Sequence, residues 1–211
     1  MKLRSLYLAL FALFTFNFAI AQESVKLPEP DRTGGKPLMQ ALNERSSSRD
    51  FIDKDLTEQQ ISNLLWAAYG INREEDGKHT TPTSRNKQDI EIYMTLKKGV
   101  FLYIPEEHSL KQLSNEDLRK VTGKQPFVKD AALNLIYVSD FDKLGNSDDN
   151  TKLMTAATHC GFIGQNVYLY CASEGLISVF RAWIDKNEIR EALQLKDNRK
   201  VIYCQTVGYS K

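Results

Sequence analysis

The sequence predicts an α+β domain in which helices flank a central sheet dominated by antiparallel strands. Residues 89–104 indicate a hairpin, because apolar and polar side chains alternate along 89–96 and a Lys-Lys-Gly turn precedes a second apolar run. Residues 131–138 are apolar and rich in strand formers, which is typical of a central strand. Residues 152–173 have the spacing of one long helix.

Length and composition are those of a single globular domain. The chain has 211 residues, of which 42% are hydrophobic and 26% are charged, and its formal net charge is +1. A chain of this size can bury a full hydrophobic core. The composition excludes a disordered chain and lacks the strong positive charge that nucleic-acid binding needs, so we expect no nucleic-acid partner.

The N-terminus predicts a secretory signal peptide over residues 1–21. A basic start precedes an apolar run, and Ala-Ile-Ala at 19–21 offers a small-residue cleavage site. A membrane anchor is the alternative, but the run is short and Asn17 interrupts it. We therefore expect a periplasmic or secreted protein with no stable membrane insertion after cleavage. Residues 22–36 predict an extended arm and 37–211 the folded domain.

Two helices are predicted in the first half of that domain. Residues 37–43 carry Leu and Met side chains on one face. Thr57 and Gln60 have the spacing of a capping box, and apolar residues at helical spacing follow them. We expect this second helix to end at Gly70.

The later elements are predicted from the same local patterns. The alternation in residues 89–97 predicts a strand with one buried face. Residues 114–121 predict a short helix that ends at Gly123. The acidic residues of 140–150 match no calcium loop, so we assign no metal site. The remaining elements are a helix that begins at the capping box 185–188 and a final strand at 201–207.

Two arginines and three serines follow the first predicted helix. Arginine offers a planar fork of donors that fits phosphate oxygens, and serine hydroxyls add short, adaptable donors and acceptors. A solvated, serine-rich helix end is the alternative interpretation. The candidate binding residues in this segment are Arg45, Ser46, Ser47 and Arg49.

Two further segments carry candidate binding groups. Residues 82–88, with the sequence Pro-Thr-Ser-Arg-Asn-Lys-Gln, offer hydroxyl and amide groups in a loop, although these residues are equally typical of turns. Gly175 follows the long helix directly, where a glycine ends the helix and can expose backbone N–H groups. The candidates here are Thr83, Ser84, Asn86, Glu174 and Gly175.

These segments resemble motifs of the nitroreductase family. Arg45, Ser47, Arg49 and Phe51 match, in order, the N-terminal flavin-binding motif of that family. Residues 82–88 resemble its Pro-Ser-x-x-Asn-x-Gln motif, with threonine in place of the first serine, and 174–176 resemble its Glu-Gly element. The segment 161–166 looks closest to the small thiazole/oxazole dehydrogenase-like branch. Ile177 stands where a second glycine is common, which narrows the substrate pocket.

The resemblance implies an intertwined homodimer with two FMN sites at its interface. It implies ping-pong hydride transfer through flavin N5 to or from a small organic substrate, with no protein group assigned as general base. It assigns the FMN phosphate to Arg45, Arg49 and Ser47, the ring or ribityl chain to Thr83, Ser84 and Asn86 of the second subunit, and N5 and O4 to the backbone of Glu174 and Gly175. Relatives continue past the final Gly-Tyr with further basic residues, whereas Lys211 alone follows here, so we expect weaker retention of FMN.

Two other functions remain open at this point. A non-catalytic flavin- or ligand-binding module would have the same fold, and an exported protein would meet little NAD(P)H as a donor. A cysteine-dependent hydrolase would use Cys160 with His159, but adjacent helical positions do not face each other.

Cys160 and Cys171 lie about 16 Å apart on one predicted helix, beyond disulfide reach, and we expect them to be buried.

Overall fold

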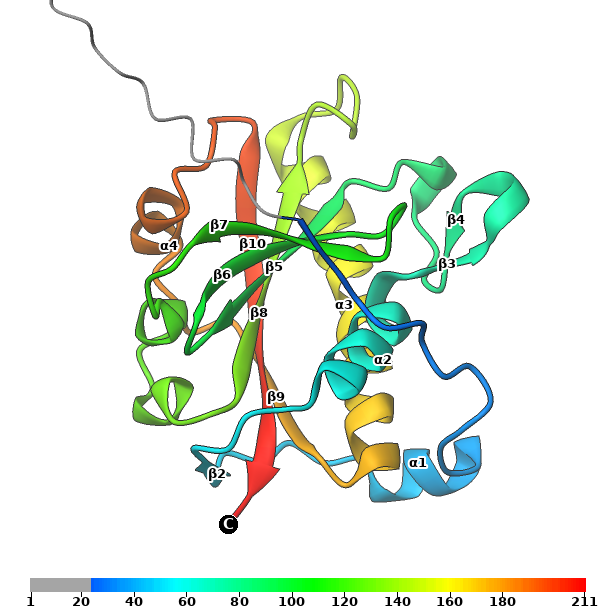
Figure 1. Ribbon diagram of the computed structural model, residues 1–211. Coiled ribbons are helices and arrows are strands. Elements are labelled where there is room, and N and C mark those ends of the chain that lie inside the picture. Colours follow the sequence, from blue (N-terminus) through cyan, green and yellow to red (C-terminus); the bar gives the residue numbers. More distant parts are fainter. Residues whose placement is uncertain (1–23) are drawn as a thin grey trace, which may run out of the picture.

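A computed structural model describes residues 24–211 of the chain (Figure 1). The predicted signal peptide and the first two residues of the predicted arm lie outside this range. In the described part, the α-helices are α1 (Leu38–Glu44), α2 (Glu58–Tyr69), α3 (Asp149–Glu174) and α4 (Lys186–Ala192). The strands are β1 (Ser24–Lys26), β2 (Phe51–Ile52), β3 (Ile71–Arg73), β4 (Lys78–His79), β5 (Ile90–Leu96), β6 (Gly99–Ile104), β7 (Ser109–Ser114), β8 (Leu133–Asp140), β9 (Ile177–Arg181) and β10 (Arg199–Ser210).

The main sheet is antiparallel and has the strand order β1-β7-β6-β5-β8-β10-β2, with β9 also paired to β10. β8 is buried along its whole length because it lies between β5 and β10. This arrangement confirms the predicted α+β class, the hairpin of β5 and β6, and the central strand.

Helices cover both faces of the sheet, with α2 and α3 on one side and α4 on the other (Figure 1). Ile92 and Met94 of β5 belong to the cluster that includes α2 and α3. Tyr93, on the opposite face of the same strand, packs into a second cluster with Ile189 of α4. The prediction that only one face of this strand is buried was therefore wrong. The alternation of side chains is present, but the polar face is covered by an element more than 90 residues away in the sequence.

The predicted helix boundaries follow local capping signals. The Thr57 side chain accepts from the Gln60 amide while the Gln60 side chain binds back to the Thr57 backbone, which confirms the capping box of α2. Gly70 ends this helix in an extended conformation. The position excludes a side chain, because a Cβ atom there would lie 2.3 Å from the Trp66 ring. Gly175 ends α3 with φ 68°, in the left-handed region that favours glycine.

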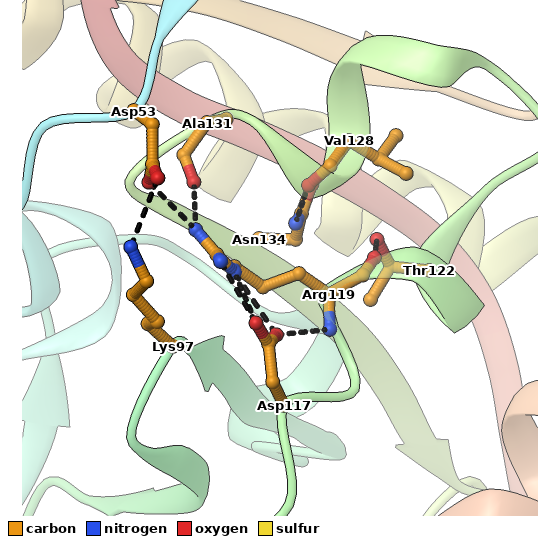
Figure 2. A network of polar contacts seen from close by, with 8 residues as sticks. All are labelled: Asp53, Lys97, Asp117, Arg119, Thr122, Val128, Ala131 and Asn134. Carbon is orange, nitrogen blue, oxygen red and sulfur yellow. Dashed lines mark hydrogen bonds and ion pairs between the residues drawn. The ribbon is translucent and has the colours of Figure 1, made fainter.

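The predicted helix at residues 114–121 was wrong. Ser109–Ser114 forms β7, and only Arg119–Thr122 turns, as a short 3₁₀ helix. The reason lies in Asp117, whose carboxylate accepts from the backbone and side chain of Arg119 instead of capping an α-helix (Figure 2). β7 and β9 were not predicted, since neither has the alternation that marked β5.

The described part of the arm lies against its own chain. β1 pairs with β7, and Leu27 is buried in the main core. Ser62 of α2 donates to the Pro28 carbonyl and Gln59 to the Glu29 carbonyl. Of the helices in residues 24–211, none is both long enough and apolar enough to cross a lipid bilayer.

Candidate functional site

The arginine–serine segment leaves α1 and runs along the side of α3. At Arg45 the backbone turns to φ −56° and ψ 121°, which ends the helix. The Arg45 guanidinium carbon lies 5.4 Å from the centre of the Tyr168 ring, a cation–π distance. The Ser47 hydroxyl lies 2.8 Å from the Tyr168 hydroxyl. Tyr168 of α3 thus holds the first half of the segment.

The hydroxyl of Tyr168 has a fixed direction. It accepts from the backbone N–H of Phe180 in β9 at 2.7 Å, so its own hydrogen is free to point at Ser47. Sequence reasoning missed Tyr168, because 121 residues separate it from Ser47. The available signal was its position two turns before the helix-ending glycine.

The second half of the segment lies beside the last strands. The Ser48 N–H donates to the Ser178 carbonyl at 3.1 Å, and the Lys211 N–H donates to the Asp50 carbonyl at 3.0 Å. The backbone of Lys211 therefore lies next to the segment. Arg49 is exposed, and within residues 24–211 neither it nor Arg45 is engaged in an ion pair.

The end of α3 lies at the same end of the molecule, which carries α1, β2 and the C-terminus in Figure 1. The N–H groups of Gly175 and Leu176 both donate to the Cys171 carbonyl. The expected free amide at Gly175 was therefore wrong, because the helix uses this donor for its own cap. A Cβ at Gly175 would meet no atom within 4 Å, so the backbone there is open to close approach. Glu174, also exposed, borders a cleft of about 410 Å³ between the arm, α1, α2 and α3.

The 82–88 loop has an unusual backbone. Arg85, Asn86 and Gln88 have positive φ angles of 53°, 53° and 46°. Such conformations cost free energy in non-glycine residues and persist where the surroundings hold them. The Thr83 hydroxyl accepts from the Gln88 N–H, which closes the turn, while Ser84 and Asn86 are exposed.

One chain does not bring all the candidate residues together. The 82–88 loop meets α3 at His159, whose Nε2 accepts from the Ser84 N–H. Gly175 follows sixteen residues later on the same helix, or roughly 24 Å along its axis at ~1.5 Å per residue. The candidates therefore form two groups, one at the C-terminal end of α3 and one beside its middle. The first contains Arg45, Ser46, Ser47, Arg49, Glu174, Gly175 and Lys211, and the second contains Thr83, Ser84 and Asn86.

The geometry excludes a cysteine nucleophile at Cys160. The Cys160 side chain is fully buried, and burial raises the pKa of its thiol well above the ordinary value. His159 is bound to Asp89 and to Ser84 instead. Cys160, Cys171 and Cys204 are all free and buried, which confirms that the first two do not form a disulfide.

The fold is an α+β domain with an antiparallel sheet, and its candidate site is a basic cluster near the end of a long helix. Residues 42–209 match the model of the nitroreductase family. The protein MJ1384 of Methanocaldococcus jannaschii, provisionally named a nitroreductase, is 31% identical over 170 residues, covering 76% of this chain and 85% of that protein. The chain belongs to the nitroreductase family and is an oxidoreductase.

Solved structures agree with this assignment. A crystal structure from Ralstonia eutropha JMP134, also provisionally named a nitroreductase, has 37% identity and a TM-score of 0.85, covering 90% of this chain and 91% of that chain. The NADPH:FMN oxidoreductase of Vibrio harveyi in complex with NAD⁺ has 18% identity and a TM-score of 0.62, covering 82% of this chain and 69% of that chain. At this identity the second likeness shows the fold alone.

Proposed function

We propose that the chain is an FMN-dependent oxidoreductase that transfers hydride in a ping-pong cycle to or from a small organic substrate. The observation that carries the proposal is the pair Arg45 and Arg49, which form no ion pair within the described residues and lie at the end of the molecule where α3 ends at Gly175. The name of the Vibrio relative, which includes FMN, supports the choice of flavin.

The donors in the first group fit a phosphate and a flat ring. Within five residues, the segment supplies two positively charged guanidinium groups and the hydroxyl donors of Ser46 and Ser47. A phosphate offers negative charge and several acceptor oxygens, which these donors can bind. Gly175 leaves backbone uncovered where a side chain would otherwise stand. The residues present therefore fit FMN.

Each residue has a task in this proposal. Arg45 and Arg49 bind the phosphate, and Tyr168 keeps Arg45 and Ser47 in place before binding. Lys211 adds a third positive charge beside the segment. When bound, FMN supplies the hydride chemistry through its N5 atom.

We further propose that a second copy completes the site. α3 exposes a stripe of apolar and small side chains that includes Met154, Gly161 and Phe162, the last with 42% of its surface exposed. Leu38 and Met39 of α1, a helix that contacts α3, are also exposed, at 63% and 75%. An antiparallel pairing of two α3 helices would bring the 82–88 loop of one chain to the Gly175 end of the other, which no single chain can do.

The test of the flavin is direct. Purified protein is expected to be yellow or to turn yellow with added FMN, and heat is expected to release FMN into the supernatant. NADPH, NADH and dithionite should be compared as donors, with a quinone and a nitroaromatic as acceptors. Flavin-loaded protein that turns over with none of these combinations would favour the non-catalytic binding module. Failure to bind any flavin would contradict the proposed function and would leave only a module that binds another ligand.

The dimer is tested separately by light scattering. Phe162→Glu puts a charge in the stripe and is expected to yield monomer, whereas Lys129→Glu, at an exposed position outside α1 and α3, should stay dimeric. We also propose that the chain is exported and cleaved after Ala21. Protein purified from its native host should then begin at Gln22, and an intact Met1 would contradict export.

A further inference from the structure

A pair of buried polar side chains lies directly beneath the 82–88 loop. Asp89 has none of its surface exposed and His159 has 2% exposed. The His159 Nδ1 lies 2.6 Å from Asp89 Oδ1, and its Nε2 lies 2.8 Å from the Ser84 backbone nitrogen. Burial of two such groups is costly unless their polar atoms are paired, which they are here.

The hydrogen bonds define which nitrogen of His159 carries the proton. A backbone N–H can only donate, so Nε2 must be the unprotonated acceptor for Ser84. The proton therefore resides on Nδ1, and Nδ1 donates it to Asp89. A swap of the two positions would place two N–H groups against each other at Ser84 and two acceptors against each other at Asp89.

Asp89 is itself held by the sheet. Its second carboxylate oxygen accepts from the Ser139 hydroxyl at 2.6 Å, and its carbonyl accepts from the Asp140 N–H at 2.7 Å. Both partners belong to β8, the central strand. A continuous chain of hydrogen bonds thus runs from β8 through Asp89 and His159 to the first residue of the turn at Ser84.

The turn needs such support because its backbone is strained. Arg85, Asn86 and Gln88 all have positive φ angles, and Ser84 immediately precedes them. A loop that must first adopt a strained conformation binds its ligand less tightly, since the ordering cost is subtracted from the binding free energy. A preformed loop avoids that cost.

We propose that Asp89 and His159 are positioning residues that hold the 82–88 loop in the conformation that meets the flavin. Neither residue touches the cofactor in this proposal, because both lie below the loop. The inference rests on the proposed function for its ligand. The part that concerns the loop is measurable without any flavin.

The experiment uses two variants of the same residue. His159→Asn keeps a donor near Nδ1 for Asp89 but loses the acceptor for Ser84. His159→Gln places an oxygen near Nε2 and keeps that acceptor. We expect the Ser84 amide to exchange about 10-fold faster in His159→Asn and within about 3-fold of wild type in His159→Gln, as NMR on flavin-free protein would measure. FMN is expected to bind ~3- to 10-fold more weakly to His159→Asn alone.

The pair separates positioning from packing. Both variants remove the imidazole ring, so a role in packing alone predicts equal effects, and equal Ser84 exchange would overturn the proposal. If either variant fails to fold, the nitrogen NMR shifts of His159 in wild-type protein still decide. A protonated Nδ1 supports the proposal, and a protonated Nε2 overturns it. Wild-type protein that binds no FMN would instead overturn the proposed function, whatever the Ser84 exchange shows.

Discussion

The chain uses arginine in two different ways, at Arg119 and at Arg45. Arg119 is buried, with 5% of its side chain exposed, and donates to both oxygens of Asp117, to Asp53 and to the Ala131 carbonyl (Figure 2). Arg45, by contrast, contacts the face of a neutral ring and has no carboxylate partner among the described residues.

The difference separates a structural cation from one that is available to a ligand. Burial opposes the ionisation of Asp117, but the hydrogen bonds from Arg119 outweigh it and lower the pKa of that carboxyl. A hydrogen bond from Lys97 is the largest cause that lowers the pKa of Asp53. The charges of the Arg119 cluster are thus satisfied inside the chain, whereas the charges of Arg45 and Arg49 can meet an external anion.

Replacement of Arg119 is expected to have the largest effect on stability. Arg119→Met leaves the buried Ala131 carbonyl without its donor and Asp117 without its bidentate partner, so we expect the free energy of unfolding to fall by about 2–4 kcal/mol. Chemical denaturation would measure this. Arg190→Met, which removes the exposed pair with Asp197, is the control and should cost less than about 0.5 kcal/mol. The affinity of folded Arg119→Met for FMN should remain within about 2-fold of wild type. A large loss of affinity would contradict the purely structural role of Arg119.

Replacement of Arg45 and Arg49 is expected to act on binding instead. The double variant Arg45→Ala/Arg49→Ala should bind FMN about 10- to 100-fold more weakly, because charge-assisted hydrogen bonds to phosphate are lost. Riboflavin lacks the phosphate, so its affinity should change little, and the two titrations together isolate the phosphate contribution. The free energy of unfolding should change by less than about 1 kcal/mol. An equal loss for FMN and riboflavin would contradict the assignment.

The pH dependence of stability should report on the histidines and not on the two arginine regions, because arginine does not titrate in this range. Burial is the largest cause that lowers the pKa of His79 and of His108 below the ordinary 6.5. Below pH 6.5 the unfolded chain therefore binds more protons than the folded one, and stability falls as the pH falls through the lowered pKa values. Stability should be highest above pH 6.5 and decline toward pH 5, as thermal unfolding would show.

His108→Asn is the matched variant for this measurement, because asparagine tolerates the φ of 46° at this position. This substitution should make the decline in stability from pH 6.5 toward pH 5 less steep. Arginine stays protonated throughout, so the steepness lost in His108→Asn belongs to the histidine. An unchanged slope would assign the decline to other groups.

The smallest effect is expected at the exposed edge of the Arg119 cluster. Asp53→Asn removes a carboxylate whose side chain is 48% exposed, while Arg119 keeps Asp117. Exposed ion pairs contribute little, so the loss should be about 0.2–1 kcal/mol in the same denaturation assay. A loss as large as that of Arg119→Met would mean that the cluster depends on Asp53 rather than on the buried pairing.

Much of the fold was predictable where the signal is local. The capping box at Thr57, the β5–β6 hairpin, the central strand and the long helix were all predicted, because each depends on residues within a few positions of one another. The helix predicted at 114–121 was wrong, because Asp117 has the chemistry of a capping residue but its carboxylate is bound by Arg119. The burial of Tyr93 was missed because the helix that covers it comes much later in the chain.

By itself the sequence determined the family, the class of the fold and the residue types that a phosphate requires, since a motif keeps its spacing whatever surrounds it. Only the tertiary structure decided which groups are free. It engaged the Gly175 amide in the helix cap, satisfied Arg119 with carboxylates and joined His159 to Asp89, 70 residues away. These partners are set by how the strands and helices pack, and packing couples positions that no local pattern in the chain connects.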